Sequence, residues 1–196
     1  MGVIIMGGEF RGRKLATDSS SQIIRPTSGK VREALFSSLG ERLMDASFVD
    51  LYAGSGAVGL EAASRGAREI LWVEKHPKSW ALLTANIKAV LGVQAGAEAV
   101  HADVGAFCRK MKETGRSFDF VFADPPFADD YSGLKDAVLG ILAPGGSGII
   151  QFPSRNPPGW LAESLENGAA KLKRYGESGL AFLAHPDDLP STEPQD

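Results

Sequence analysis

The sequence predicts an α/β fold in which a mostly parallel sheet is covered by helices on both faces. From about residue 43 onward, apolar runs of strand length alternate with segments of helical periodicity, which is the pattern of parallel strands joined by crossover helices. The loop Gly54-Ser55-Gly56-Ala57-Val58-Gly59 directly follows the first of these runs and opens a helical segment. The last two runs flank a glycine-containing turn, which predicts an antiparallel hairpin at the end of the sheet.

Seven strands are expected along the chain. In order they cover Ser47–Leu51, Glu69–Val73, Ala97–His101, Phe118–Ala123 and Ser147–Phe152, followed by the hairpin strands Lys171–Tyr175 and Leu180–Ala184. Helical segments with apolar residues three and four apart fit between them. These segments are Gly59–Arg65, Pro77–Leu91, Gly105–Thr114, Tyr131–Leu142 and Trp160–Glu166.

Residues 1–43 form a short basic extension before the sheet. A β-like stretch holds Arg11, Arg13 and Lys14, and a helix that Thr27 or Ser28 caps follows it. Val31, Leu35 and Leu39 would point this helix at the core. Residues 1–42 carry seven basic and four acidic side chains, a net charge of +3, although the whole chain has −3. Residues 44–186 are expected to form the main domain, and residues 187–196 a disordered acidic tail.

Composition excludes several classes of protein. A chain of 196 residues with 43% hydrophobic residues can bury one substantial core. The single cysteine, Cys108, allows no internal disulfide, and the three histidines lack the spacing of metal ligands. No metal is therefore expected, and no apolar run is long enough to span a membrane. These features are typical of a cytoplasmic protein, and we expect a monomer.

The glycine loop and the second strand indicate a site for a nucleotide-like cofactor. Glycines let the loop turn tightly, and the first amides of the next helix are free to bind a ligand. Glu74 ends the second strand, where a carboxylate can accept hydrogen bonds from both hydroxyls of an unmodified ribose. These features fit NAD and S-adenosylmethionine equally well. Asp103 follows the third strand, where it could accept from an adenine amine or cap the helix beginning near Val104.

The motif Asp124-Pro125-Pro126-Phe127 directly follows the fourth strand and suits a planar ring that bears an amine. Two prolines remove two backbone donors, so the neighbouring carbonyls are left to accept hydrogen bonds. Asp124 also accepts when it is ionised, and Phe127 offers a π-face for stacking. From these four residues alone, an ordinary proline-rich turn is equally plausible. Beside a cofactor loop the motif predicts a methyl-acceptor site, because a dehydrogenase has no use for it.

With these motifs the sequence resembles class I S-adenosylmethionine-dependent methyltransferases, whose Rossmann-like sheets of seven strands also end in an antiparallel hairpin. More narrowly, it resembles the family that methylates guanine N2 in bacterial 16S ribosomal RNA. Residues 8–15 (GEFRGRKL) and 25–36 (RPTSGKVREALF) carry this narrower resemblance. The family usually has Asp-Arg where this chain has Gly29-Lys30. The resemblance implies S-adenosylmethionine as methyl donor, S-adenosylhomocysteine as product, and 16S rRNA within an assembling small ribosomal subunit as partner.

Three groups of candidate site residues follow. Residues expected at the cofactor are Asp50, Tyr52, Ala53, Gly54, Gly56, Glu74, Lys75, Asp103, Val104 and Asp124. Those expected at the reacting amine are Asp124, Pro125, Pro126 and Phe127. Those expected to bind RNA, because cations and helix amino termini attract phosphate, are Arg11, Arg13, Lys14, Arg25, Thr27, Lys30 and Arg32.

The expected reaction is direct transfer of the sulfonium methyl group to a guanine amine held by the Asp124 carboxylate and the Pro125 carbonyl. Three alternatives remain open. Adenine also offers an exocyclic amine, so an adenine-N6 methyltransferase acting on DNA or RNA would use the same acceptors. A non-catalytic RNA-binding protein of ribosome assembly could keep the fold. An NAD-linked oxidoreductase is the least supported alternative, because no residue set for hydride chemistry is evident.

Overall fold

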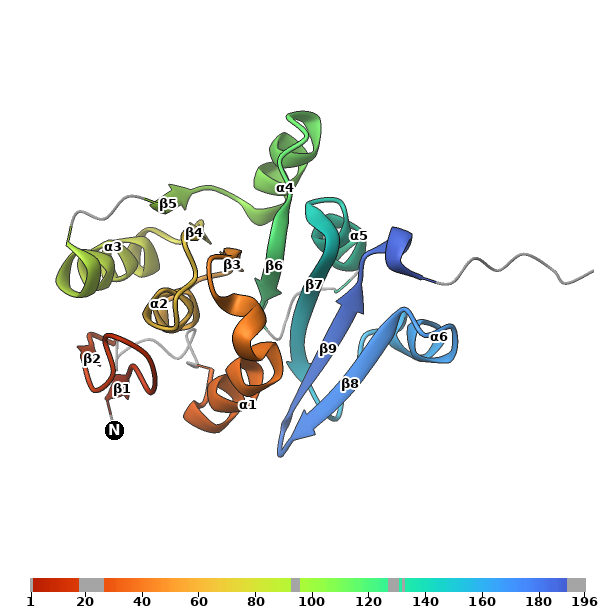
Figure 1. The fold of residues 1–196 in the computed structure, drawn as a ribbon, viewed down its shortest axis with the longest axis horizontal. Helices are drawn as coiled ribbons and strands as arrows, with labels where there is room; N and C mark the ends of the chain where they lie inside the picture. The colour runs from red at the N-terminus through yellow and green to blue at the C-terminus, as the bar shows by residue number, and fades with distance from the viewer. Residues whose placement is uncertain (1, 18–26, 93–95, 127–130, 132, 190–196) are drawn as a thin grey trace, which may run out of the picture.

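A computed structural model describes residues 2–17, 27–92, 96–126, 131 and 133–189. Within these residues the central element is a seven-stranded sheet with the order β5-β4-β3-β6-β7-β9-β8 (Figure 1). The strands are β3 (Ser47–Leu51), β4 (Glu69–Glu74), β5 (Ala97–His101), β6 (Phe118–Ala123), β7 (Leu142–Pro153), β8 (Ala170–Tyr175) and β9 (Ser178–Ala184). The strands β3 to β7 pair in parallel, whereas β9 is antiparallel to both of its neighbours. The predicted sheet with its closing hairpin is therefore confirmed.

Helices cover both faces of this sheet (Figure 1). One hydrophobic cluster joins the strands to α1 (Gly29–Leu39), α2 (Ala57–Ser64) and α3 (Pro77–Leu91). A second cluster joins them to α4 (Val104–Glu113), α5 (Leu134–Leu139) and α6 (Leu161–Glu166). Alternate strand residues supply the two clusters: Phe48 belongs to the first and Val49 to the second. Because both faces are buried, the inner strands read as continuous apolar runs.

The N-terminal residues pack into the same core and form part of its first cluster. Strands β1 (Val3–Ile4) and β2 (Lys14–Leu15) make a small antiparallel pair, and Ile5, Phe10 and Leu15 are buried. The fully buried Glu61 of α2 accepts hydrogen bonds from the amides of Met6 and Gly7 at 2.8 Å each. Ser28 caps α1 by accepting from the Val31 amide at 3.3 Å, as one of the two predicted caps. A 3₁₀ turn, Gly40–Leu43, leads into β3.

Several boundaries differ from the expected ones for local reasons. The helix expected over Tyr131–Leu142 begins at Leu134 and ends at Leu139, because Gly140 caps it and Leu142 already pairs with Phe118 in the sheet. Strand β7 is correspondingly longer than expected, with a register shift between Phe118 and Phe120. Arg11 and Arg13 lie in the turn between β1 and β2, and only Lys14 lies in a strand.

The last described residues, 187–189, lie at the start of the predicted acidic tail, whose disorder stays a prediction. Pro186–Asp188 form a 3₁₀ turn, and the Gly145 amide donates to the Asp188 carboxylate at 2.8 Å. An amide of strand β7 thus gains an acceptor from the residues after β9. Residues 190–196 lie outside the described residues.

Candidate functional site

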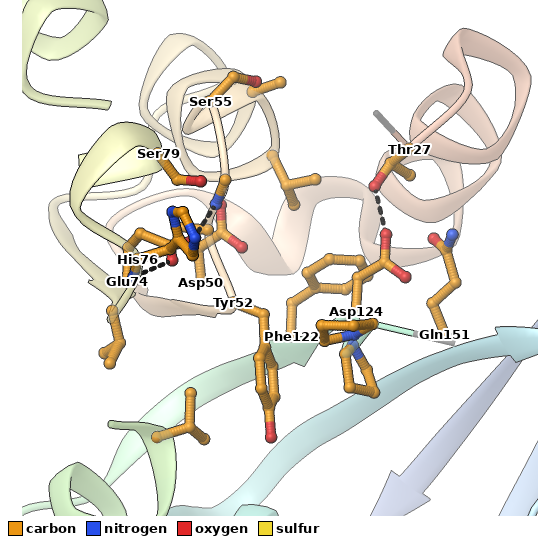
Figure 2. Close-up of a pocket in the computed structure, with 18 of the residues that line it drawn as sticks. Thr27, Asp50, Tyr52, Ser55, Glu74, His76, Ser79, Phe122, Asp124 and Gln151 are labelled. Atoms are coloured by element: carbon orange, nitrogen blue, oxygen red, sulfur yellow. Dashed lines mark hydrogen bonds between the residues drawn. The ribbon is translucent and has the colours of Figure 1, made fainter. Parts of the chain in front are cut away.

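A cavity of about 330 Å³ lies at the carboxyl ends of the parallel strands, where ligands bind in open α/β sheets. Residues from β3, β4, β6, β7 and the hairpin β8–β9 line it, together with Thr27 and Ser28 before α1 (Figure 2). The predicted residues in its wall are Asp50, Tyr52, Ala53, Gly54, Glu74, Lys75, Val104, Asp124, Pro125 and Pro126. The topology therefore brings the expected cofactor and acceptor motifs into one cavity.

The glycine loop forms the turn between β3 and α2. Gly54 and Gly56 have φ angles of 57° and 80°, a backbone conformation that glycine adopts without strain. Tyr52, which also lines the cavity, has a φ of 61°, which is uncommon for a residue with a side chain and occurs preferentially at functional sites. Gly56 caps α2 and is absent from the cavity wall, so its role is to shape the loop.

Asp50 and Glu74 hold this loop in place through hydrogen bonds to its backbone and to the start of α2. The Asp50 carboxylate accepts from the Gly59 amide at 2.9 Å, and it is 2% exposed. Burial raises the pKa of Asp50 well above its usual range, and the negative charges of Asp124 and Glu74 raise it further. Glu74 accepts from the Gly54 amide at 2.9 Å and from the His76 amide at 2.7 Å. Its two oxygens are thereby fixed at the cavity wall, each with a further lone pair.

Asp124 lies at the end of β6 and has a partner that the sequence did not indicate. The Thr27 hydroxyl, 97 positions earlier in the chain, donates to Asp124 Oδ2 at 2.7 Å (Figure 2). Removal from water raises the pKa of Asp124 to about 6, and the hydrogen bond from Thr27 opposes this increase. Pro125 and Pro126 follow it in the cavity wall. Phe127, expected to stack on the acceptor ring, lies outside the described residues.

Asp103 has the capping role that was its alternative interpretation. Its Oδ1 accepts from the Ala106 amide at 3.2 Å at the start of α4, and its Oδ2 lies 3.7 Å from Lys75 Nζ. It does not line the cavity, although its neighbours Lys75 and Val104 do. Contact between Asp103 and a ligand stays a prediction.

The predicted RNA-binding residues differ in their exposure. Arg11, Arg13, Lys14 and Lys30 are exposed, and Arg13 also donates to the Val90 carbonyl. Arg25 lies outside the described residues. Arg32 is 2% exposed and donates to the Ile4 carbonyl at 3.0 Å, so its side chain joins α1 to β1 and is not available to a phosphate. The RNA-binding expectation is therefore wrong for Arg32, because its position around helix α1 directs the side chain to the core side of the helix.

Several residues that line the cavity were not predicted from the sequence. Gln151 comes from β7, and Tyr175, Glu177 and Ser178 come from the tip of the β8–β9 hairpin. Gln151 has a recognisable signal, since it is the only polar side chain in the run Ile149-Ile150-Gln151-Phe152. The hairpin residues have no such signal, because their place at the cavity depends on how the hairpin packs beside β7.

Carboxylates outnumber cations in the cavity wall. Asp50, Glu74, Asp124 and Glu177 line it, whereas Lys75 is its one lysine or arginine among the described residues. An environment of this kind favours a ligand that carries positive charge and hydrogen-bond donors. The described residues contain no group of three or more histidine, cysteine, aspartate or glutamate side chains placed to hold a metal ion. Within the same residues, no helix is both long and apolar enough to cross a membrane.

Comparison with known proteins covers nearly the whole chain. The sequence model of a family described as conserved hypothetical protein 95 matches residues 3–184. A relative from Escherichia coli, ribosomal RNA small subunit methyltransferase D, is 37% identical over 143 residues, which are 72% of this chain and 67% of the relative.

Two solved structures define the fold class. A hypothetical protein from Thermus thermophilus matches with a TM-score of 0.77 and 34% identity over 93% of this chain and 99% of the other. A SAM-dependent methyltransferase from Agrobacterium tumefaciens matches with a TM-score of 0.61 and 16% identity over 78% of this chain and 60% of the other. The fold is therefore that of the class I methyltransferases.

Proposed function

The chain belongs to the family described as conserved hypothetical protein 95, and from this premise we propose that it is an S-adenosylmethionine-dependent methyltransferase of ribosomal RNA. The proposed acceptor is the N2 amine of a guanine in 16S rRNA of the small subunit. The observation that carries the proposal is that Asp124-Pro125-Pro126, the glycine loop and Glu74 line the same cavity. The curated relative is named for the same class of reaction on small-subunit rRNA.

The residues around the glycine loop fit S-adenosylmethionine. Glu74, held by two backbone amides, would accept from the ribose hydroxyls. The carboxylate-rich wall suits a molecule with a sulfonium and an ammonium group. When bound there, S-adenosylmethionine supplies the methyl group on its sulfonium, and S-adenosylhomocysteine is the product. Asp50 supports the loop by accepting a hydrogen bond from the Gly59 amide.

The residues after β6 would hold the acceptor amine. Thr27 bonds Asp124 Oδ2, which orients the carboxylate so that Oδ1 can accept one amine hydrogen while the Pro125 carbonyl accepts the other. Both acceptors favour the pyramidal amine, whose lone pair attacks the methyl carbon. The C–N bond forms as the C–S bond breaks, and the electron pair of the C–S bond remains on sulfur. With a pKa of about 6, Asp124 is the proposed acceptor of the proton that the methylated amine then loses.

The proposed partner is 16S rRNA in an assembling small subunit, bound by a monomer. Arg11, Arg13, Lys14 and Lys30 are exposed on the N-terminal part of the chain and would contact phosphates. Extruding a base costs a few kcal/mol, so contacts of this kind must hold the RNA while the guanine enters the cavity.

The experiment compares the wild-type chain with Asp124→Ala and Asp119→Ala, a control at the opposite end of β6. Purified protein is given labelled S-adenosylmethionine and 16S rRNA that lacks the modification, either free or in assembled subunits. Mass spectrometry should identify N2-methylguanosine. We expect Asp124→Ala to lower kcat by about 100-fold or more, because the amine loses its hydrogen-bond acceptor. Calorimetry with S-adenosylhomocysteine measures whether the variant is folded and still binds.

Asp119→Ala should retain near-normal turnover, since Asp119 bonds Ser47 outside the cavity. Labelled N6-methyladenosine in place of N2-methylguanosine would contradict the proposed acceptor. Absence of any S-adenosylmethionine binding would contradict the proposal that the chain is a methyltransferase. Near-normal turnover by Asp124→Ala would contradict the roles assigned to the residues after β6.

A further inference from the structure

Gln151 is a buried amide in the wall of the cavity, with an exposed fraction of 5%. Ala123 of β6 pairs with Ile150 of β7 in parallel register, so the next residues along the two strands are Asp124 and Gln151. Figure 2 shows the Gln151 side chain beside that of Asp124, both extending toward Thr27. Gln151 therefore lies at the end of the cavity that Asp124 and Thr27 form, and not at the glycine loop.

The Gln151 Oε1 atom is buried and accepts no hydrogen bond from any residue that the structure describes. Burial of an unpaired amide oxygen is unfavourable, and proteins seldom tolerate it without a functional reason. Because this side chain lines a cavity of about 330 Å³, a donor on a bound ligand can supply the missing partner.

The neighbours of Gln151 determine which donor pattern fits. Thr27 donates to Asp124 Oδ2, and Asp124 Oδ1 and Gln151 Oε1 are two further acceptors at this end of the cavity. Pro125 also lines the cavity, and its carbonyl is the proposed third acceptor. Pro125 and Pro126 have no amide hydrogen to offer. Guanine carries three hydrogens along one edge, two on N2 and one on the adjacent N1. Adenine carries two on N6, whereas its adjacent N1 is an acceptor and would face Gln151 Oε1 unfavourably.

We propose that Gln151 is a specificity-determining residue that accepts a hydrogen bond from N1–H of the target guanine and so disfavours adenine. The inference rests on the proposed guanine-N2 methylation and adds the choice of base, which Asp124 cannot make because both bases offer it an amine. A site that hydrogen-bonds a substrate group rejects analogues without that group, since its own buried atom is then left unpaired.

The test replaces the target guanine, once mapped, with 2-aminopurine, which keeps the N2 amine but has no hydrogen on N1. The wild-type chain should prefer guanine over 2-aminopurine by about tenfold or more in kcat/KM. In Gln151→Met, of similar size and without the amide, the guanine rate should fall and the preference should shrink to within about threefold. Gln151→Glu keeps an acceptor oxygen at this position and should retain the preference.

Ser154→Ala is the matched control, because Ser154 Oγ is also buried without a partner in the described structure but lies outside the cavity wall. It should leave the preference unchanged. Melting temperature and S-adenosylhomocysteine affinity measured for each variant distinguish a lost contact from a lost fold. A preference in Gln151→Met equal to that of the wild type, in folded protein, would overturn the role of Gln151 alone. A wild-type chain that methylates no guanine would overturn the proposed function and this inference together.

Discussion

The protonation of Asp124 depends on two opposing local effects. Removal of the carboxylate from water raises its pKa to about 6, and the hydrogen bond from the Thr27 hydroxyl stabilises the ionised form. Only the ionised carboxylate can both accept from an amine and take up its proton. Methyl transfer by the wild-type chain should therefore decline as the pH falls through about 6.

Thr27→Val should move this acid limb to higher pH, because the valine cannot donate to Asp124 and the neutral carboxyl becomes relatively more stable. We expect kcat at pH 7 to fall by about tenfold and to recover as the pH rises. Thr27→Ser keeps the hydroxyl and should keep the wild-type profile.

The measurement is kcat against pH for the three proteins. The three proteins differ only at position 27, whose hydroxyl donates to Asp124, so a difference between their profiles reports on the loss of that hydrogen bond. A uniform loss of kcat at every pH would show that Thr27 acts on packing and not on the Asp124 carboxylate.

At the scale of elements, the glycine loop depends on close contact between α2 and β4. Gly59 lies in the first turn of α2, and a Cβ added there would be 2.1 Å from Nε1 of the buried Trp72. Trp72 Nε1 in turn donates to the Gly56 carbonyl at 3.4 Å. The last glycine of the motif thus allows the helix to approach the sheet, and this approach positions the loop that precedes it.

Gly59→Ala should destabilise the fold by about 2 kcal/mol, because the buried tryptophan cannot move away without disturbing the core. For a chain of this size the melting temperature should fall by about 4 to 8 °C in a thermal unfolding scan. Gly159→Ala is the control, since a Cβ there would have no neighbour within 4 Å. Equal melting temperatures for the two variants would show that α2 can shift to accommodate the methyl group.

At the scale of the whole molecule, positive charge is concentrated in the N-terminal residues. Residues 1–42 carry +3 in a chain of net charge −3, so the remaining residues carry −6. The N-terminal residues are nevertheless packed into the main core, and Thr27 reaches the cavity from them. The same part of the chain therefore presents exposed cations and contributes a side chain to the proposed reaction centre.

Replacing both Arg11 and Lys14 by glutamine should weaken binding to 16S rRNA, because two phosphate contacts are lost. The slope of log affinity against log salt concentration should decrease by about 1.4, or about 0.7 for each cation that contacts single-stranded RNA. The control replaces Lys110 and Lys112, which are exposed on α4 and distant from the N-terminal residues in sequence. Filter binding at several salt concentrations measures both variants, and an equal change in both would indicate a general charge effect.

Elements and motifs with local patterns were predictable from the sequence alone. Strands β3, β5 and β6 and helix α3 have the predicted bounds. Burial makes β3 and β6 largely apolar runs, and Pro77 marks the start of α3. The glycine loop, Glu74 and the Asp124 motif follow strand ends, and parallel topology brings such ends to one edge. The shorter α5 and longer β7 were missed, since Leu142 fits a helical period but pairs in the sheet.

The fold class, the glycine loop and the Asp124-Pro125-Pro126 motif were predictable from the sequence, because each depends on neighbouring residues whose spacing sets their direction and burial. Three contacts became evident only in the folded chain: Thr27 bonds Asp124, Gln151 lies beside Asp124 with an oxygen that no described residue bonds, and Arg32 is buried. These contacts join residues far apart in the chain, and a side chain that could equally face solvent, RNA or the core acquires its partner only when the elements pack together.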